Sequence, residues 1–145
     1  MIHYWRFKGQ SIAFTNGCFD IFHAGHADYL ARAADLATVL IVGLNTDKSV
    51  QRLKGSERPV HNQHGRGIVL ASLSFVDAVV LFDEDTPEQI IKLIQPDVLV
   101  KGSDYKPEEI AGADIVKKND GKVYTLPLLE GYATSDIIEK VKTFK

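Results

Sequence analysis

The sequence has little of what marks secreted, membrane-spanning or nucleic-acid-binding proteins. It contains one cysteine in 145 residues, which excludes an internal disulfide and suits a reducing compartment. No apolar run approaches the ~20 residues of a membrane span, and the polar start lacks a signal peptide's order of parts. The 17 basic and 19 acidic residues are mixed, with a net charge of −2, so no basic face for nucleic acid is expected. We therefore expect a cytoplasmic protein that binds neither membranes nor nucleic acids.

Other patterns are missing as well. No Gly-x-Gly-x-x-Gly follows the first apolar run, which argues against a dinucleotide-binding or redox domain. There is no acidic cluster with metal-ligand spacing, no internal repeat and no linker-like tract. A chain of 145 residues fits one domain with a sizeable core. We expect residues 1–145 to form that single domain.

Short apolar runs alternate with amphipathic stretches along the chain. The runs expected as strands are Ser11–Thr15, Thr38–Val42, Ala78–Leu81, Val98–Val100 and Lys122–Thr125. The expected helices are Gly25–Leu36, Lys48–Leu53, Arg66–Ser74, Pro87–Ile94 (with Thr86 as its N-cap), Glu108–Lys118 and Ser135–Val141. Alternation of this kind predicts an α/β fold, a Rossmann-like doubly wound domain with a five-stranded parallel sheet.

The unusual polar segments follow the carboxyl ends of expected strands, where open α/β sheets bind their ligands. These segments are Thr15–Asp20, Asn45–Asp47, Lys101–Asp104 and Glu130–Ser135. Their convergence on one edge of the sheet predicts a binding site there.

The first of these segments runs into His23-Ala-Gly-His26, where a helix should begin. The spacing puts both imidazoles on one face of the first helical turn, beside unpaired N–H groups that favour an anion. Gly25 between them lets a phosphate approach the backbone closely. The two histidines could instead suggest zinc, but no third and fourth ligand lie nearby in sequence. We therefore predict a phosphate site with no protein-built metal site.

The pattern resembles the His-x-Gly-His nucleotidyltransferases, which transfer a nucleoside monophosphate from a nucleoside triphosphate to a phosphate-bearing acceptor. Thr15–Asp20, Leu53–Gly55 with Arg58-Pro59 behind it, and Lys101–Gly112 look like one subfamily, the heptose 1-phosphate adenylyltransferases. The resemblance implies adenylyl transfer from ATP to a heptose 1-phosphate, giving ADP-heptose for bacterial lipopolysaccharide. Many relatives are fused to a sugar kinase, and this chain looks like the stand-alone form. Homo-oligomers are common among them, so a dimer or larger assembly is expected.

A sister group offers the alternative within enzymes. Glycerol phosphate cytidylyltransferases typically carry Arg-Thr before Glu-Gly in the last loop, where this chain has Leu128-Leu129. The apolar pair favours an adenine nucleotide, but a cytidylyltransferase acting on glycerol 3-phosphate or another polyol or sugar phosphate remains the second candidate. A nucleotide-binding module without turnover is the third.

A sugar phosphate is already largely dianionic near neutral pH, because its second pKa is about 6. Catalysis then needs positioning and electrostatic stabilisation rather than a general base. The residues expected to be catalytic are His23, His26, Lys54 and Arg66. Those expected to bind the nucleotide are Thr15, Asn16, Gly17, Cys18, Phe19, Asp20, Gly25, Asp47, Lys101, Gly102, Asp104, Thr134 and Ser135. Mg²⁺ is expected to arrive with ATP, because it binds largely through substrate phosphates.

Several of these residues have a simpler structural interpretation. Asp20 could only tie down its turn, Asp47 could be a helix N-cap, and Cys18 could be a small apolar filler. Solvated or paired surface charges and ordinary turn chemistry would account for the rest: Lys54, Arg58, Arg66 and Asp104-Tyr105.

Overall fold

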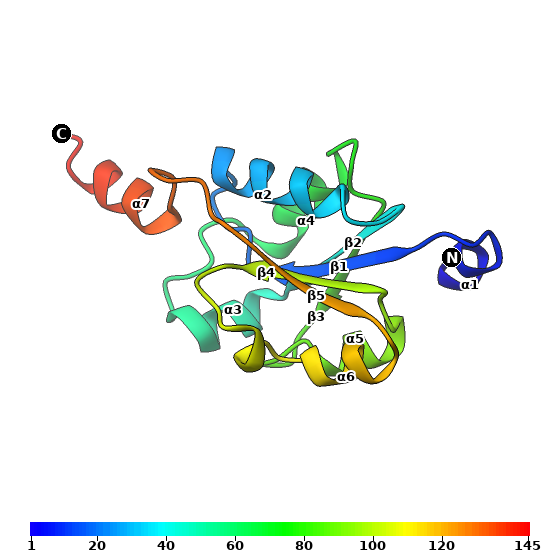
Figure 1. The fold of residues 1–145 in the computed structure, drawn as a ribbon. Helices are drawn as coiled ribbons and strands as arrows, with labels where there is room; N and C mark the ends of the chain where they lie inside the picture. Colours follow the sequence, from blue (N-terminus) through cyan, green and yellow to red (C-terminus); the bar gives the residue numbers. More distant parts are fainter.

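Five parallel strands form the single sheet of the computed structural model, which describes residues 1–145 (Figure 1). The strands are β1 (Ile12–Gly17), β2 (Val39–Asn45), β3 (Ala78–Phe82), β4 (Val98–Gly102) and β5 (Lys122–Leu126). They lie in the order β3-β2-β1-β4-β5. The predicted α/β class and all five predicted strands are confirmed, and each strand extends further at its carboxyl end than the sequence indicated.

The two central strands have the apolar sequences that burial on both faces requires. Every residue of β2 is buried, and Ile12 to Thr15 of β1 have no exposed surface. The chain runs outward from β1 to β3 and then returns to β4, on the other side of β1. The strand order therefore reverses between β1 and β4, which is where such sheets bind ligands.

Seven α-helices and one short 3₁₀ helix accompany the sheet. They are α1 (Ile2–Phe7), α2 (Ala24–Ala34), α3 (Asp47–Lys54), α4 (Gln63–Ala71), α5 (Glu88–Ile94), η1 (Pro107–Glu109), α6 (Ala113–Lys118) and α7 (Thr134–Lys142). Helices α2 and α4 cover one face, and α5 and α6 the other (Figure 1). No helix is both long and apolar enough to cross a lipid bilayer.

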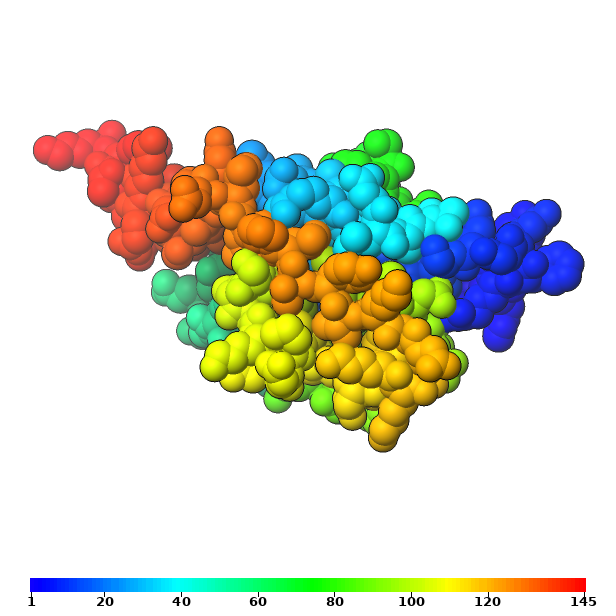
Figure 2. Space-filling model, viewed as in Figure 1, coloured from blue at the N-terminus to red at the C-terminus, as the bar shows by residue number.

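Alternate residues of the central strands supply the two halves of the core. Ile12, Phe14 and Ile41 pack toward α5 and α6, whereas Ala13 and Leu40 pack toward α2 and α4. Both terminal helices lie outside these layers, at opposite ends of the molecule (Figure 2). Helix α7 has no buried residue, although it begins beside the predicted site.

The structure corrects several predicted helices. Helix α1 was not predicted, and no side chain caps it. The predicted helix Glu108–Lys118 is broken, because Gly112 adopts a left-handed φ of 87° and α6 begins only after it. Thr86 does not cap α5: Pro87 holds that position without a side-chain hydrogen bond. Helix α4 begins three residues before the predicted Arg66, because Asn62 accepts a hydrogen bond from Gly65 N.

Substituting Gly112 tests how tightly α6 docks on α5. A Cβ atom there would lie 2.4 Å from Cδ1 of the buried Ile91. Gly112→Ala should therefore lower the free energy of unfolding by about 1–2 kcal/mol, because alanine is strained in the left-handed conformation. Overpacking against Ile91 should lower it by roughly 1–3 kcal/mol more. Gly9→Ala is the matched control, because Gly9 has a φ of 68° with nothing within 4 Å of its Cβ position. Urea unfolding should show the larger loss for Gly112→Ala; equal losses would contradict this packing.

Candidate active site

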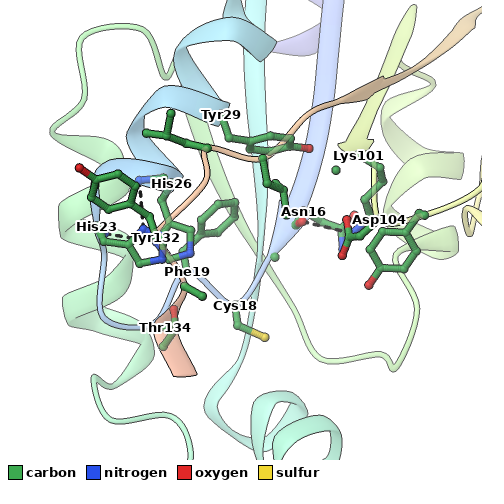
Figure 3. Close-up of a pocket in the computed structure, with 17 residues that line it drawn as sticks. Asn16, Cys18, Phe19, His23, His26, Tyr29, Lys101, Asp104, Tyr132 and Thr134 are labelled. Atoms are coloured by element: carbon green, nitrogen blue, oxygen red, sulfur yellow. Dashed lines mark hydrogen bonds between the residues drawn. The ribbon is translucent and has the colours of Figure 1, made fainter. Parts of the chain in front are cut away.

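Two adjoining cavities open at the carboxyl ends of the strands, beside the switch point between β1 and β4. Their volumes are about 340 Å³ and about 770 Å³. We call the smaller cavity the apolar compartment, and Tyr29, Leu128, Leu129 and Tyr132 line this cavity only (Figure 3). We call the larger cavity the polar compartment, and Lys54, Arg58 and Asp85 line this cavity only. Residues on the wall common to both are Asn16, Gly17, Cys18, Phe19, His26, Lys101, Asp104, Tyr105, Ala133 and Thr134.

The two histidines cap the first turn of α2. His23 is the N-cap residue, with extended backbone, and its Nδ1 accepts from Gly25 N at 3.0 Å. His26 Nδ1 accepts from His23 N at 3.3 Å, which completes a reciprocal capping box. The rings stack with centroids 3.8 Å apart. Because each Nδ1 accepts a backbone hydrogen bond, each neutral ring carries its proton on Nε2 and donates from there.

Both rings are held in the neutral form. The pKa of His26 is lowered to about 4, mainly by burial and to a smaller extent by the neighbouring His23. The rings of Phe19 and Phe22 lie 5.5 and 5.4 Å from that of His26. Burial also lowers the pKa of His23. Two uncharged Nε2–H donors are therefore present at neutral pH.

Gly25 is required by close packing. A Cβ atom at this position would lie 2.8 Å from Cε1 of His23 and 3.0 Å from Cβ of Tyr132. A larger residue would displace the His23 ring from its hydrogen bond with the backbone, so the glycine keeps the pair in place.

Asp20 braces the loops, although it also lines the polar compartment. The residue is 2% exposed, and its carboxylate accepts from Val60 N at 2.7 Å, His61 N at 2.9 Å and Arg58 Nε at 2.9 Å. Burial alone would raise the pKa of Asp20, but these three donors outweigh it and hold the pKa below its usual value. Protein donors occupy both oxygens, which favours the structural interpretation of Asp20. Its role in nucleotide binding stays a prediction.

Arg66 is also used within the protein. Its side chain is buried, and Nε donates to His61 O at 2.9 Å. Nη1 donates to Cys18 O and Asn45 O, and Nη2 donates to Asp47 Oδ1 at 2.8 Å. The side chain lines neither cavity, which favours its structural interpretation, and its catalytic role stays a prediction.

Two further residues predicted to bind the nucleotide have side chains that are bonded within the protein. Asp47 is occupied by Arg66, and the N-cap of α3 is Thr46, whose hydroxyl accepts from Ser49 N. Thr15 has no exposed surface, and its hydroxyl lies 2.8 Å from the Tyr29 hydroxyl. Both residues are close to the site in sequence, but their side chains are used to build the fold.

The remaining predicted residues line the cleft, and their roles in binding stay predictions. They are Asn16, Gly17, Cys18, Phe19, His23, Gly25, His26, Lys54, Lys101, Gly102, Asp104, Thr134 and Ser135.

Among these residues, Lys101 and Asn16 have side-chain polar atoms that could make further hydrogen bonds. Burial lowers the pKa of Lys101, whose Nζ makes one hydrogen bond, to Asn16 O at 3.4 Å. Asn16 Oδ1 is buried without a partner. Cys18 differs, because burial raises the pKa of its thiol despite the nearby cations. The thiol is therefore protonated, as an apolar filler would be.

Sequence reasoning assigned no binding or catalytic role to several residues that line the cleft, among them Arg58, Tyr105 and Tyr132. Arg58 and Tyr105 lie inside motifs that carried the resemblance, and Tyr132 lies inside the segment Glu130–Ser135. Because they lie next to residues that were predicted to bind the substrates, the sequence offered some indication that they belong to the site. Only the fold shows that their side chains line the cavities.

Comparisons with known proteins identify the family of the chain. Residues 14–140 match the family model described as cytidylyltransferase-like. "Bifunctional protein HldE" of Campylobacter concisus is 55% identical over 95% of this chain, and that of Wolinella succinogenes is 51% identical over 95%. The chain spans only 29% and 28% of these two relatives.

Two solved structures share the fold. The "lipopolysaccharide core biosynthesis protein" of Thermoplasma volcanium superimposes with a TM-score of 0.67 at 25% identity, over 86% of this chain and all of that one. A pantoate-beta-alanine ligase of Francisella tularensis gives a TM-score of 0.57 at 17% identity, over 97% of this chain and 74% of that one. The second comparison supports the fold alone. Since the family model spans nearly the whole chain and the resemblance drawn from His23-Ala-Gly-His26 is confirmed, the chain belongs to the cytidylyltransferase-like family.

Proposed function

We propose that this chain is an adenylyltransferase that moves AMP from ATP to a heptose 1-phosphate, giving ADP-heptose and pyrophosphate for lipopolysaccharide synthesis. The observation that carries the proposal is the position of His26, on the wall common to the apolar and the polar compartment. A nucleoside held in the first and a sugar phosphate in the second would bring the α-phosphorus to the neutral Nε2–H donors.

The comparisons support the choice of acceptor. The chain is similar over most of its length to proteins named "Bifunctional protein HldE" and to a protein named for lipopolysaccharide core biosynthesis. Together with the resemblance of Leu53–Gly55 and Lys101–Gly112 to heptose 1-phosphate adenylyltransferases, these names favour a heptose phosphate.

The apolar compartment favours ATP over CTP. Leu128, Leu129 and Tyr132 line it, and no arginine does. Apolar and aromatic walls suit the large flat face of a purine. Glycerol phosphate cytidylyltransferases, by resemblance, carry Arg-Thr where this chain has Leu128-Leu129. A cytidylyltransferase acting on a polyol phosphate therefore stays the second candidate.

The chemistry proposed is a single in-line displacement. An oxygen of the acceptor phosphate forms a bond to the α-phosphorus, the bond from that phosphorus to the bridging oxygen breaks, and its electron pair leaves with pyrophosphate. The acceptor is already ionised, so no residue has to remove a proton. His23 and His26 would donate hydrogen bonds where negative charge builds, and Lys54 and Lys101 would offset the charge of the phosphates.

Mg²⁺ is proposed to enter with ATP. The structure gathers no group of three or more His, Cys, Asp or Glu side chains that could hold a metal ion. Asp104 is the one carboxylate lining the apolar compartment, and it also lines the polar one. A nucleotide-bound Mg²⁺ commonly uses one or two protein carboxylates, so Asp104 fits that need. When bound, the ion would neutralise part of the triphosphate charge.

We also propose a cytoplasmic homo-oligomer. ATP as a substrate and a single half-buried cysteine suit the cytoplasm. Edge strand β3 leaves Val80 and Leu81 partly exposed, and the neighbouring α4 exposes Ile68 and Val69. A second copy would cover these side chains.

A substrate screen tests the function directly. Pyrophosphate release should be fastest with ATP and a heptose 1-phosphate. Faster release with CTP and glycerol 3-phosphate would favour the cytidylyltransferase. Tight ATP binding without pyrophosphate from any phosphate ester would favour a binding module.

Replacing the histidines should abolish most turnover without unfolding the chain. His23→Asn keeps a good N-cap side chain but removes the Nε2–H donor, and His26→Ala removes the second donor. Each variant should lose roughly 10²–10³ in turnover, as loss of one preorganised donor does. Circular dichroism should show native helix content in both. Turnover near that of the parent chain would rule out the proposed role.

The neutral histidines also predict a dependence of stability on pH. The pKa of His26 is about 4 in the folded chain, below its model-compound value of 6.5. Between these two pH values the unfolded chain binds more protons than the folded chain. The contribution of the neutral His26 to the free energy of unfolding is therefore complete above pH 6.5 and is lost as the pH falls toward 4. Urea unfolding at pH 7 and pH 5 should show a smaller loss for His26→Gln than for the parent. An identical loss would contradict a buried neutral His26.

A further inference from the structure

The loop between α3 and α4 is fastened to the turn after β1 by two buried charged residues. Asp20 accepts from His61 N at 2.9 Å, and Arg66 Nε donates to His61 O at 2.9 Å. The two peptide groups on either side of His61 are therefore both hydrogen-bonded, one to the carboxylate of Asp20 and one to the guanidinium of Arg66. Val60 N donates to the same carboxylate, and Arg66 Nη1 donates to Cys18 O. The loop is tied to the very turn that precedes the histidine pair.

Arg58 lies in this loop, and only part of its guanidinium is used. Nε donates to Asp20 Oδ2 at 2.9 Å, and no hydrogen bond to protein involves either terminal nitrogen. The side chain is 21% exposed and lines the polar compartment. Asp20, by contrast, has a side chain that is 1% exposed. The inner nitrogen is thus anchored while the two outer ones remain available at the cavity wall.

The polar compartment around Arg58 contains both cationic side chains and carboxylates. Lys54 and Lys101 line the same compartment. Of its carboxylates, Asp20 is neutralised by Arg58 itself, and Asp85 accepts from Arg52 Nε at 2.9 Å. Asp104 and Glu109 also line the wall. A guanidinium presents paired N–H groups that match two phosphate oxygens, which a lysine cannot do.

We propose that Arg58 binds the phosphate of the acceptor substrate and that Asp20 is the positioning residue that aims it. This inference rests on the proposed function, in which the acceptor is a phosphate ester. The buried carboxylate fixes the direction of the guanidinium, so less side-chain entropy is lost when phosphate binds.

The first test separates the two substrates. Arg58→Ala should raise the KM for the acceptor roughly 10- to 100-fold, the range for losing a charge-assisted hydrogen bond. The KM for ATP should change by less than about threefold, because no nucleotide contact is removed. Lys48→Ala, on the exposed surface of α3 and outside both cavities, is the matched control and should leave both values unchanged. Equal rises in both KM values, or no rise, would overturn the assignment.

The second test concerns positioning by Asp20. Asp20→Asn should raise the acceptor KM and increase amide hydrogen exchange at Val60 and His61, which donate to the carboxylate. The double variant with Arg58→Ala should have an acceptor KM no higher than that of Arg58→Ala, because both changes remove one interaction. Arg58→Lys, which keeps the charge and the fold but loses the Nε contact, should not rescue binding. An additive double variant, or full rescue by lysine, would contradict positioning by Asp20.

A binding measurement separates this proposal from the proposed function. With the nucleotide site saturated by α,β-methylene ATP, inorganic phosphate should bind the parent chain and bind Arg58→Ala at least about tenfold more weakly. That result would stand even if no heptose phosphate supported turnover. Equal phosphate binding by both would overturn the Arg58 site, even if the adenylyltransferase activity were present.

Discussion

The site depends on one reciprocal interaction, in which two imidazoles cap the first turn of α2 with their Nδ1 atoms. The capping hydrogen bonds satisfy backbone donors that a helix start leaves unpaired. The same bonds fix the tautomer, so that each ring keeps its Nε2–H for a ligand. Close packing at Gly25 and burial against Phe19 and Phe22 then hold the rings in place and uncharged. Helix stability and the proposed catalytic geometry therefore come from the same side chains.

A second layer of buried charge arranges the loops around this pair. Asp20 and Arg66 are remote in sequence from several of the groups they bind, yet together they connect the turn after β1, the end of β2 and the loop before α4. The side chains of Asp20 and Arg66 form their hydrogen bonds with other groups of the protein. The side chains left free at the cavity walls, Lys54, Arg58 and Lys101, are those with few or no partners. This division separates residues that build the site from residues that can bind a substrate.

The sequence predicted the parts of the structure that depend on local pattern. The five strands are short, near-continuous apolar runs, and the His23-Ala-Gly-His26 segment falls at a strand-to-helix turn, so both were recognisable. The sequence could not show that the side chains of Arg66, Asp47 and Thr15 bond within the protein, because most of their partners lie 14 to 48 positions away along the chain. The break before α6 was missed because only the packed backbone at Gly112 shows its left-handed conformation. Helix α1 has no capping side chain and no fully buried residue that would indicate it, and only the partly buried Ile2 and Trp5 pack against the core.

The central claim is that the paired imidazoles bind the α-phosphate of a nucleotide. A crystal structure with a non-hydrolysable ATP analogue tests it most directly. The account predicts an α-phosphate oxygen within hydrogen-bonding distance of Nε2 of His23 or His26, with the base against Leu128 and Tyr132. Density showing the nucleotide outside this cleft, or the two rings turned away from its phosphates, would contradict it.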